Sequence, residues 1–496
     1  MISDIKNYLK NVKMKSEFIL GLFFQIMIFS SFWGSVLLPI TVPGIGEMFL
    51  FRIMIFITSI LFVLHLVINK VNPFKGKNKL EYMVFILITI MILYGILSLA
   101  RAIDIAFTFR RLFNLCIDVT FLLLLILYIN DRMKINITLF NCIINMIILS
   151  LLGIYEAFHG GIFYDKYDIY QRFPLFDVGY IQFPTVSFNN TNDFSCTLLF
   201  YLPFVIAFLL THINKNNKYK KLYIVLLSLT TSLSYFIVKL ASARLAMISV
   251  YIIIISLFAY IIIFKRKLWS IIVLCSMCFA FIFVMENYKQ LKADTINIAN
   301  NIKYKYEKMT SDEVIEKPET YTIPTKETLS LKEQLIVVDE ETNEVTLNTE
   351  ASVGTRVALL RFSIKTFIKS YGFGVGLGNT EQMAKAVAVE QLGGMWSMHC
   401  FAARFLADMG ILVLLPIIII VLFIIKLLFK LVRSNNIKDS SVMIPILFTV
   451  VSIICFPLLS TSPSDAQDIL GMWFCIAAII ITIIKVPSLL NQSNLE

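Results

Sequence analysis

The residues best suited to chemistry lie between Arg356 and His399, in a glycine-rich stretch. Residues 372–379 read Gly-Phe-Gly-Val-Gly-Leu-Gly-Asn, so the backbone there can bend sharply and approach other groups closely. A guanidinium such as that of Arg356 binds two phosphate oxygens at once, and the imidazole of His399 can accept a proton from a hydroxyl near neutral pH. We therefore expect an anionic substrate and an activated hydroxyl here. A histidine at the membrane interface without a catalytic role is the alternative interpretation of His399.

The composition is that of a membrane protein, since 58% of the 496 residues are hydrophobic and 16% are charged. Many apolar runs reach about 20 residues, which is enough for a helix to cross the hydrocarbon core. We expect an all-α polytopic membrane protein with about twelve transmembrane helices and one large extracytoplasmic loop. The expected spans are 17–38, 47–69, 81–100, 112–129, 137–156, 194–213, 222–239, 244–264, 268–285, 402–425, 441–460 and 468–484.

Positive charge is concentrated before the first span and in every second connection after it. These basic segments are 6–15, 70–79, 132–134, 215–221, 265–267 and 426–438. By the positive-inside rule they face the cytoplasm. The protein is therefore expected in the cytoplasmic (inner) membrane, with both termini in the cytoplasm and the long segment 286–401 outside. The same distribution accounts for much of the net charge of +11 and argues against nucleic acid as a partner.

The chain is expected to form a membrane domain with nine spans, an extracytoplasmic loop with the catalytic segment, and a second membrane domain with three spans, at residues 1–285, 286–401 and 402–496. Within the loop, residues 286–350 carry eight Lys or Arg against fourteen Asp or Glu, whereas residues 351–401 carry five against two. The acidic part is expected to be solvated surface with a β-hairpin from Val337 to Leu347. The basic part is where an anionic ligand is expected to bind.

Five cations break the positive-inside pattern. Arg101, Arg110 and Arg111 are expected in the connection between the third and fourth spans, and Lys239 and Arg244 flank a short turn between the seventh and eighth. Cations on the outer side oppose correct insertion, so a compensating use is expected. Snorkelling to lipid phosphates explains any one of them equally well. For Arg244 we favour a ligand-binding role over snorkelling. Arg244 and Arg356 together could bind one diphosphate without a metal, because each guanidinium can bind two phosphate oxygens.

The loop 157–193 mixes aromatic and polar side chains, among them Tyr170 and Arg172. Such a mixture is typical of a sugar site and equally of an aromatic belt at the membrane interface. The eight cysteines lie in or at the expected spans, so buried single thiols are favoured over disulfides or a metal site. No metal and no cofactor is expected.

Four local patterns in one order resemble the O-antigen ligase/polymerase family of membrane glycosyltransferases. They are Ser187–Asn192 with Pro203 in the following span, Ala241–Arg244, Gly354–Arg356 followed by Gly374–Asn379, and His399 followed by Asp408–Gly410. The resemblance covers most of residues 180–425. This chain departs from the family in two places, because the usual Ser-Arg-Gly reads Ser-Ala-Arg-Leu at 242–245 and the usual His-Asn reads His-Cys at 399–400.

The resemblance implies a GT-C-like membrane fold and a metal-independent, inverting transfer of a glycan from a polyprenyl-diphosphate carrier to an acceptor hydroxyl at the outer face. By that analogy Arg244 and Arg356 hold the diphosphate and His399 activates the hydroxyl. Further candidates for binding the diphosphate or the glycan are Arg101, Arg110, Arg111, Lys239, Arg361, Asn190, Asn192, Tyr170 and Arg172. The expected partners are the carrier-linked glycan donor and acceptor and the lipid bilayer, with a flippase and a chain-length regulator as further candidates.

Within the family, a polymerase that joins carrier-linked repeat units and a ligase that transfers the finished chain stay open. The heavy use of Ile, Asn, Lys, Phe and Tyr indicates the AT-rich genome of a Gram-positive bacterium. Such a bacterium has no lipopolysaccharide that could accept a finished chain from a ligase. The composition therefore favours a polymerase of a capsule, an exopolysaccharide or a teichuronic-type polymer. A transporter of polysaccharide or lipid-linked oligosaccharide is the alternative from another class, but such proteins usually show related halves, which this chain lacks. A peptidoglycan polymerase would need an acidic catalytic centre that has no obvious match.

Overall fold

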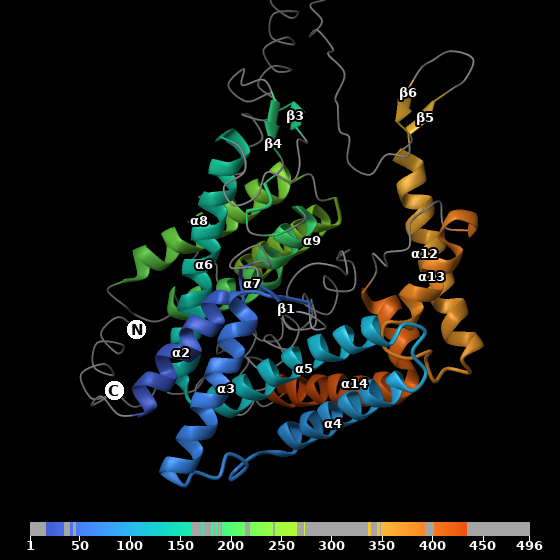
Figure 1. The fold of residues 1–496 in the computed structure, drawn as a ribbon. Coiled ribbons are helices and arrows are strands. Elements are labelled where there is room, and N and C mark those ends of the chain that lie inside the picture. Colours follow the sequence, from blue (N-terminus) through green and yellow to red (C-terminus); the bar gives the residue numbers. More distant parts are fainter. Residues whose placement is uncertain are drawn as a thin grey trace, which may run out of the picture.

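The structure is a computed structural model, in which the chain is predominantly helical (Figure 1). It describes residues 16–33, 40–42, 46–159, 170–172, 180–182, 184–186, 188, 191–213, 219–241, 244–264, 272, 336–338, 345–347, 349–391 and 401–433. The helices in these ranges are α2 Ser16–Ser30, α3 Leu50–Asn69, α4 Lys79–Leu99, α5 Ile105–Tyr128, α6 Arg132–His159, α7 Thr191–Ile213, α8 Lys220–Leu240, α9 Arg244–Phe264, α12 Thr349–Lys369, α13 Asn379–Gln391 and α14 Phe401–Arg433.

Seven helices of the described part, α3 to α8 and α14, are long and apolar enough to cross a membrane. Two more, α2 and α9, contain shorter apolar stretches. The helical class is thus confirmed for the described residues, and the candidate spans fit a multi-pass membrane protein. The predicted spans 441–460 and 468–484, and all but one residue of 268–285, lie outside the described residues, so the count of twelve stays a prediction.

The described strands form three small antiparallel hairpins. The sequence analysis predicted only the third of them. They pair β1 Ile40–Val42 with β2 Gly46–Met48, β3 Tyr170–Arg172 with β4 Tyr180–Gln182, and β5 Ile336–Val338 with β6 Val345–Leu347. The hairpin predicted from Val337 to Leu347 is confirmed by the third pair, in which Val338 lies opposite Val345.

One helix boundary differs from the sequence prediction in a way that affects the candidate site. Helix α5 begins at Ile105 rather than near residue 112, because the side chain of Asp104 accepts a hydrogen bond of 3.0 Å from the amide of Phe107 and caps the helix. Arg110 and Arg111 therefore lie in the first two turns of a helix, and the prediction that they occupy a connecting loop is wrong.

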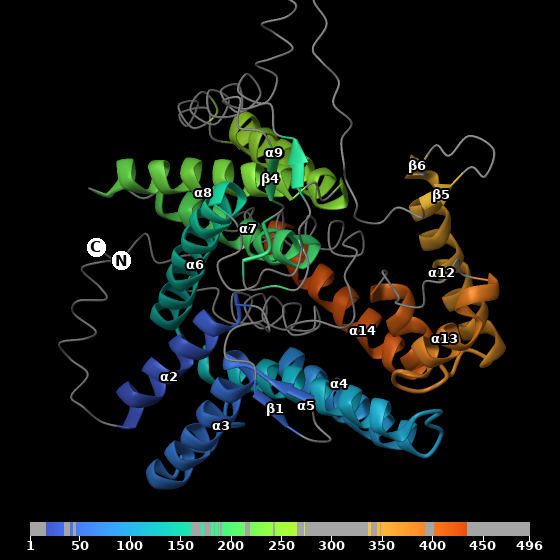
Figure 2. The ribbon, with the colours of Figure 1, turned by 45° about the horizontal axis from the view of Figure 1, so that its top comes forward.

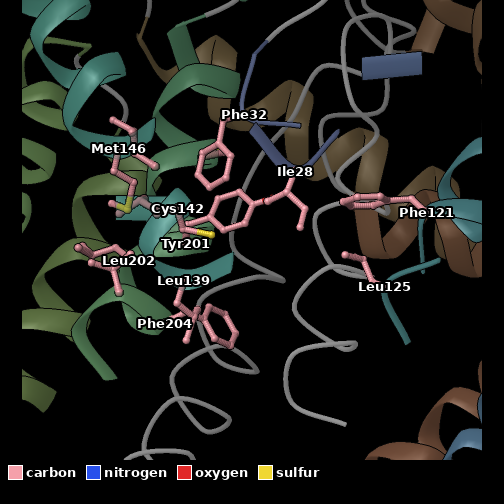
Figure 3. Close-up of a cluster of buried hydrophobic side chains, with 14 of the residues drawn as sticks. Ile28, Phe32, Phe121, Leu125, Leu139, Cys142, Met146, Tyr201, Leu202 and Phe204 are labelled. Atoms are coloured by element: carbon pink, nitrogen blue, oxygen red, sulfur yellow. The ribbon is translucent and has the colours of Figure 1, made fainter. Parts of the chain in front are cut away.

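The largest hydrophobic core of the described residues includes side chains from α2 to α9 and from α14, and Figure 3 shows the part that α2, α5, α6 and α7 contribute. The rings of Phe32 and Tyr201 stack with centroids 3.8 Å apart, and Tyr201 is fully buried. Polar groups join the same region, since the indole nitrogen of Trp33, three residues beyond α2, donates to Asn145 of α6 over 3.2 Å, and the side-chain nitrogen of Asn141 donates to the carbonyl oxygen of Gln25 in α2 over 2.8 Å. In a bilayer, where lipid tails are as apolar as the core, such packing and interhelical hydrogen bonds are what associate the helices.

A second group of elements carries the glycine-rich stretch. Helices α4, α5 and α14 lie side by side, and α12 runs crosswise at one end of them with α13 beside it, as both views show (Figures 1 and 2). The arrangement brings α12 to the ends of helices that are candidates for crossing the membrane.

Candidate functional site

The glycine loop, residues 370–378, connects α12 to α13. Its four glycines, at positions 372, 374, 376 and 378, all have positive φ angles, between 78° and 103°. This left-handed region is one that residues with a Cβ atom adopt only at a cost. The alternating glycines therefore allow a backbone path that most other residues would resist.

The glycine loop is hydrogen-bonded to α14 where that helix is broken at Gly410, whose φ of 63° and ψ of −165° are not helical. Three backbone hydrogen bonds join the two segments, from Val375 to Ala407, from Gly376 to Asp408 and from Ile411 to Gly372, with lengths of 2.9, 3.0 and 2.8 Å. The loop thus provides partners for backbone groups that the break leaves without their helical ones.

Two glycines permit this close approach. A Cβ atom on Gly374 would stand 2.5 Å from the carbonyl oxygen of Asp408, and one on Gly410 would stand 2.2 Å from the carbonyl carbon of Phe373. Real Cβ atoms essentially never come so near to backbone atoms. Any side chain at either position would push the glycine loop away from α14.

The buried carboxylate of Asp408 fixes the start of α13. One of its oxygens accepts a hydrogen bond from the amide of Gly378 over 3.1 Å, and the other accepts one from the amide of Thr380 over 3.0 Å. Amides at the beginning of a helix have no partner inside that helix, and a negative charge there is favourable. Asp408 therefore caps α13 from a different helix.

Tyr94 of α4 joins the same backbone contact. Its hydroxyl lies 2.7 Å from the carbonyl oxygen of Phe373 and 3.2 Å from that of Asp408. Both oxygens belong to the segments that meet at the break, so one phenol ties α4 to the glycine loop and to α14.

Asn379 attaches the connection between α4 and α5. Its side-chain nitrogen donates to the carbonyl oxygens of Arg101, over 2.9 Å, and Val375, over 2.7 Å, and its side-chain oxygen accepts from the amide of Ile103 over 3.1 Å. All its hydrogen-bonding directions but one acceptor site are thus used in holding two loops together.

We call the contacts among the glycine loop, α14, the start of α13, Tyr94 and the α4–α5 connection the junction. Arg111 and Glu381 add an ion pair to it, with 2.7 Å between Nη2 and a carboxylate oxygen. Both side chains are largely shielded from solvent, and the guanidinium also lies over the ring of Phe107. The pair joins α5 to the first turn of α13.

The junction lies at one end of α4, and the basic connection 70–79 lies at the other. Tyr94, Arg101 and Ile103 are near or beyond the C-terminal end of the helix, whereas Lys79 begins it. If α4 crosses the membrane, the glycine loop and that basic connection face opposite sides.

A second buried carboxylate, that of Glu156, binds the chain just before α7 and the pattern Ser187–Asn192. The buried carboxylate of Glu156 accepts hydrogen bonds from the amide and hydroxyl of Thr185, over 3.1 and 2.9 Å, and from the amide of Val186. It fixes the chain as it approaches α7, whose first residue is Thr191.

The predicted site residues fall into two groups. His399 and Asn190 lie outside the described residues. For five further candidates the structure describes the backbone but not the side chain: Arg244 in α9, Arg356 in α12, Asn192 in α7, and Tyr170 and Arg172 in β3. The described candidates are Arg101 and Arg111 at the junction, exposed Arg110 on α5, half-buried Lys239 on α8 and exposed Arg361 on α12. The structure brings Arg101 and Arg111 to the glycine loop.

His399 precedes the first residue of α14 by two positions. The segment it enters, up to Met409, is attached to the glycine loop through Ala407 and Asp408. Sequence reasoning quoted Asp408 as part of a pattern without giving it a role, and it missed Tyr94 and Glu156. No short-range signal marks Tyr94, because its partners lie hundreds of residues away.

Among the residues that the structure describes, no three His, Cys, Asp or Glu side chains gather in a group that could hold a metal ion. Catalysis without a metal or cofactor stays a prediction.

Residues 226–418 match a family model described as O-antigen ligase. The resemblance to this family is confirmed. The matched segment contains Arg244, Arg356, the glycine loop, His399 and Asp408. The chain is also similar to the teichuronic acid biosynthesis protein TuaE of Bacillus subtilis (strain 168), with 27% identity over 125 residues. That similarity covers 25% of this chain, and the chain spans about a quarter of the relative's length.

Proposed function

We propose that this protein is a membrane glycosyltransferase of surface polysaccharide biosynthesis, which polymerises polyprenyl-diphosphate-linked repeat units at the outer face of the cytoplasmic membrane. The observation that carries the proposal is the family match, because it includes all three residues of the expected catalytic set. The apolar helices fit a substrate whose carrier is a lipid. The name of the relative TuaE favours a teichuronic-type product.

The proposed topology has twelve spans with both termini in the cytoplasm and the loop 286–401 outside. The positive-inside rule supports it. The relation of the glycine loop to α4 supports it as well, since a basic connection and the catalytic segment then face opposite sides of the membrane.

In the proposed reaction, Arg244 and Arg356 bind the diphosphate and His399 accepts the proton of the acceptor hydroxyl. The hydroxyl oxygen forms a bond to the anomeric carbon, the bond from that carbon to the diphosphate oxygen breaks, and the electron pair leaves with the diphosphate. Fixed cations offset the charge that develops there, and holding both substrates in line lowers the entropic cost of reaction. Direct displacement inverts the anomeric centre.

The junction described above would position this machinery. Helix α12 carries Arg356, and the chain enters α14 just after His399, while Asp408 and the glycine loop hold these two helices together. Arg111, paired with Glu381, is assigned a positioning role. For the other candidates we propose diphosphate contacts by Arg101, Arg110 and Lys239, and glycan contacts by Asn190, Asn192, Tyr170 and Arg172.

The test is elongation by purified protein in lipid nanodiscs, with one carrier-linked repeat unit as the sole substrate and with excess EDTA. We expect a ladder of carrier-linked products that differ by one repeat. Products only after addition of a second acceptor would make the protein a ligase, and a requirement for divalent metal would overturn the arginine-only mechanism. If the protein moved the substrate across the bilayer and formed no product, it would be a transporter.

A further inference from the structure

The exposed side of α12 combines an apolar stripe with a basic stripe. Leu360, Ile364 and Ile368 recur at intervals of four residues and are 39%, 43% and 66% exposed. Arg361, Lys365 and Lys369 recur at the same interval one position later, and all three are exposed. Residues four apart lie on one face of a helix, so the two stripes run side by side along the helix.

The opposite side of α12 is already occupied. Leu359 packs against Ala384 of α13, and Ser363 and Thr366 are buried as well. The exposed stripes are therefore not the face that holds α12 in the fold. The sequence from 351 to 369 contains no acidic residue, and Glu350, at the start of α12, precedes Arg361 by eleven positions, so no acidic residue of α12 lies within two turns of the basic stripe.

The apolar stripe continues toward the helices that are candidates for crossing the membrane. Beyond the end of α12, Tyr371 is 91% exposed and Phe373 is 52% exposed. The hydrogen bond from Ile411 to Gly372 brings the same turn to α14, where Ile411 and Leu412 are themselves exposed within an apolar span. Helix α12 runs crosswise at the end of α4, α5 and α14, so its long axis lies across the ends of these three candidate spans (Figures 1 and 2).

We propose that the exposed side of α12 lies in the membrane–water interface and binds the headgroups of anionic phospholipids. The apolar stripe would enter the boundary of the acyl chains, and the basic stripe would meet the phosphates. A helix with an apolar face beside a Lys and Arg face, set parallel to the bilayer surface, is the form that interfacial helices take. Juxtamembrane cations of this kind are attracted to anionic lipid.

Lipid headgroups fit the basic stripe better than one carrier diphosphate does. From residue 361 to residue 369 the helix rises about 12 Å, because each residue adds about 1.5 Å. The oxygens of a diphosphate cluster around two adjacent phosphorus atoms, so a single diphosphate would leave part of the stripe unpaired. Arg361 also lies five positions from Arg356, about 140° around the helix axis, so the two do not share a face. Arg361 is thereby assigned to the bilayer rather than to the reacting diphosphate.

The experiment uses the full-length protein in nanodiscs that contain equal amounts of phosphatidylglycerol and phosphatidylcholine. A photoreactive benzoylphenylalanine replaces Ile364, and covalent lipid adducts are identified by mass spectrometry after illumination. The same residue in place of Ile419, which is exposed within the apolar span of α14, is the positive control, and in place of exposed Lys385 on α13 it is the aqueous control.

We expect adducts at position 364 as abundant as those at 419, and few at 385. Adducts at 364 should contain phosphatidylglycerol in excess, on the order of fivefold or more, since each cation near an anionic surface contributes about that factor. The triple variant Arg361→Gln, Lys365→Gln and Lys369→Gln should reduce the excess to the ratio found at 419. No adducts at 364, or an excess that the triple variant leaves unchanged, would overturn the proposal. Displacement of phosphatidylglycerol by added polyprenyl diphosphate would assign the stripe to substrate instead. None of these readouts depends on catalytic activity.

Discussion

Gly410 of α14 and Phe373 of the glycine loop meet backbone to backbone, so closely that a Cβ atom on Gly410 would stand 2.2 Å from the Phe373 carbonyl carbon. The contact places the break in a candidate transmembrane helix directly against the loop that follows α12. It explains why the broken helix and the glycine loop form one unit, and it makes Gly410 a sensitive position.

Gly410→Ala should lower the melting temperature of the purified protein and reduce its activity. A residue with a Cβ at positive φ costs about 1 to 3 kcal/mol, and the steric overlap with Phe373 adds to that cost. Gly76→Ala is the matched control, because Gly76 also has a positive φ, of 76°, but has open space around its Cβ position. Equal effects of the two substitutions on the melting temperature would contradict the close-contact explanation.

Asp408→Asn should destabilise the protein by about 1 to 3 kcal/mol, since an amide has one acceptor oxygen and would leave one of the two amides of Gly378 and Thr380 without a partner. Asp408→Ala should cost more. Asp131→Asn is the comparison, because Asp131 accepts from the amide of Lys134 in a local and partly exposed cap. Chemical denaturation in detergent measures the differences, and a smaller loss for Asp408→Asn than for Asp131→Asn would argue against a capping role.

Arg111→Ala, Glu381→Ala and the double variant form a thermodynamic cycle for the ion pair at 2.7 Å. We expect the single losses to add up to more than the double loss, with a coupling energy of about 0.5 to 3 kcal/mol, because each single variant removes the oppositely charged partner of a shielded charge. The pair of Lys134 and Asp131, at 3.6 Å with the carboxylate half exposed, should couple by less than about 1 kcal/mol. Additive effects at Arg111 and Glu381 would show that their contact contributes nothing.

His399→Ala, Arg244→Ala and Arg356→Ala should each abolish polymer formation at normal protein level. Replacement of either arginine by Lys should restore activity only in part, because an ammonium lacks the bidentate fork. His159→Ala is the control for the histidine, since His159 is exposed at the end of α6 and stacks on Tyr155. Elongation of carrier-linked repeat units is the assay, and full activity of His399→Ala would eliminate the general-base assignment.

Lys385→Cys and Lys75→Cys test the proposed topology, in a variant whose native cysteines are replaced. Both lysines are exposed, one on α13 and the other in the basic connection before α4. In intact cells freed of wall, a membrane-impermeant thiol reagent should label position 385 at once and position 75 only after permeabilisation. The reverse pattern would place the glycine loop in the cytoplasm.

Much of the helical layout follows from the sequence because a bilayer leaves the backbone few choices. An apolar run of about 20 residues must satisfy its own hydrogen bonds inside the bilayer, and a helix does so locally. For this reason the predicted span 244–264 coincides with α9, and the predicted spans 47–69 and 222–239 agree closely with α3 and α8. The hairpin from Val337 to Leu347 was predictable for a similar reason, since its pattern is local.

The start of α5 and the junction at the glycine loop were decided only by the tertiary structure. A side-chain cap at Asp104 outweighed the hydropathy boundary and drew Arg111 into a helix, where it could reach Glu381, 270 positions away. Tyr94 and Asp408 likewise act on backbone atoms of other segments. Spacing along the chain reveals the residues that share a helix face, but it does not reveal which backbone atoms Tyr94, which is half-buried, and Asp408, which is buried, bind once separate helices pack.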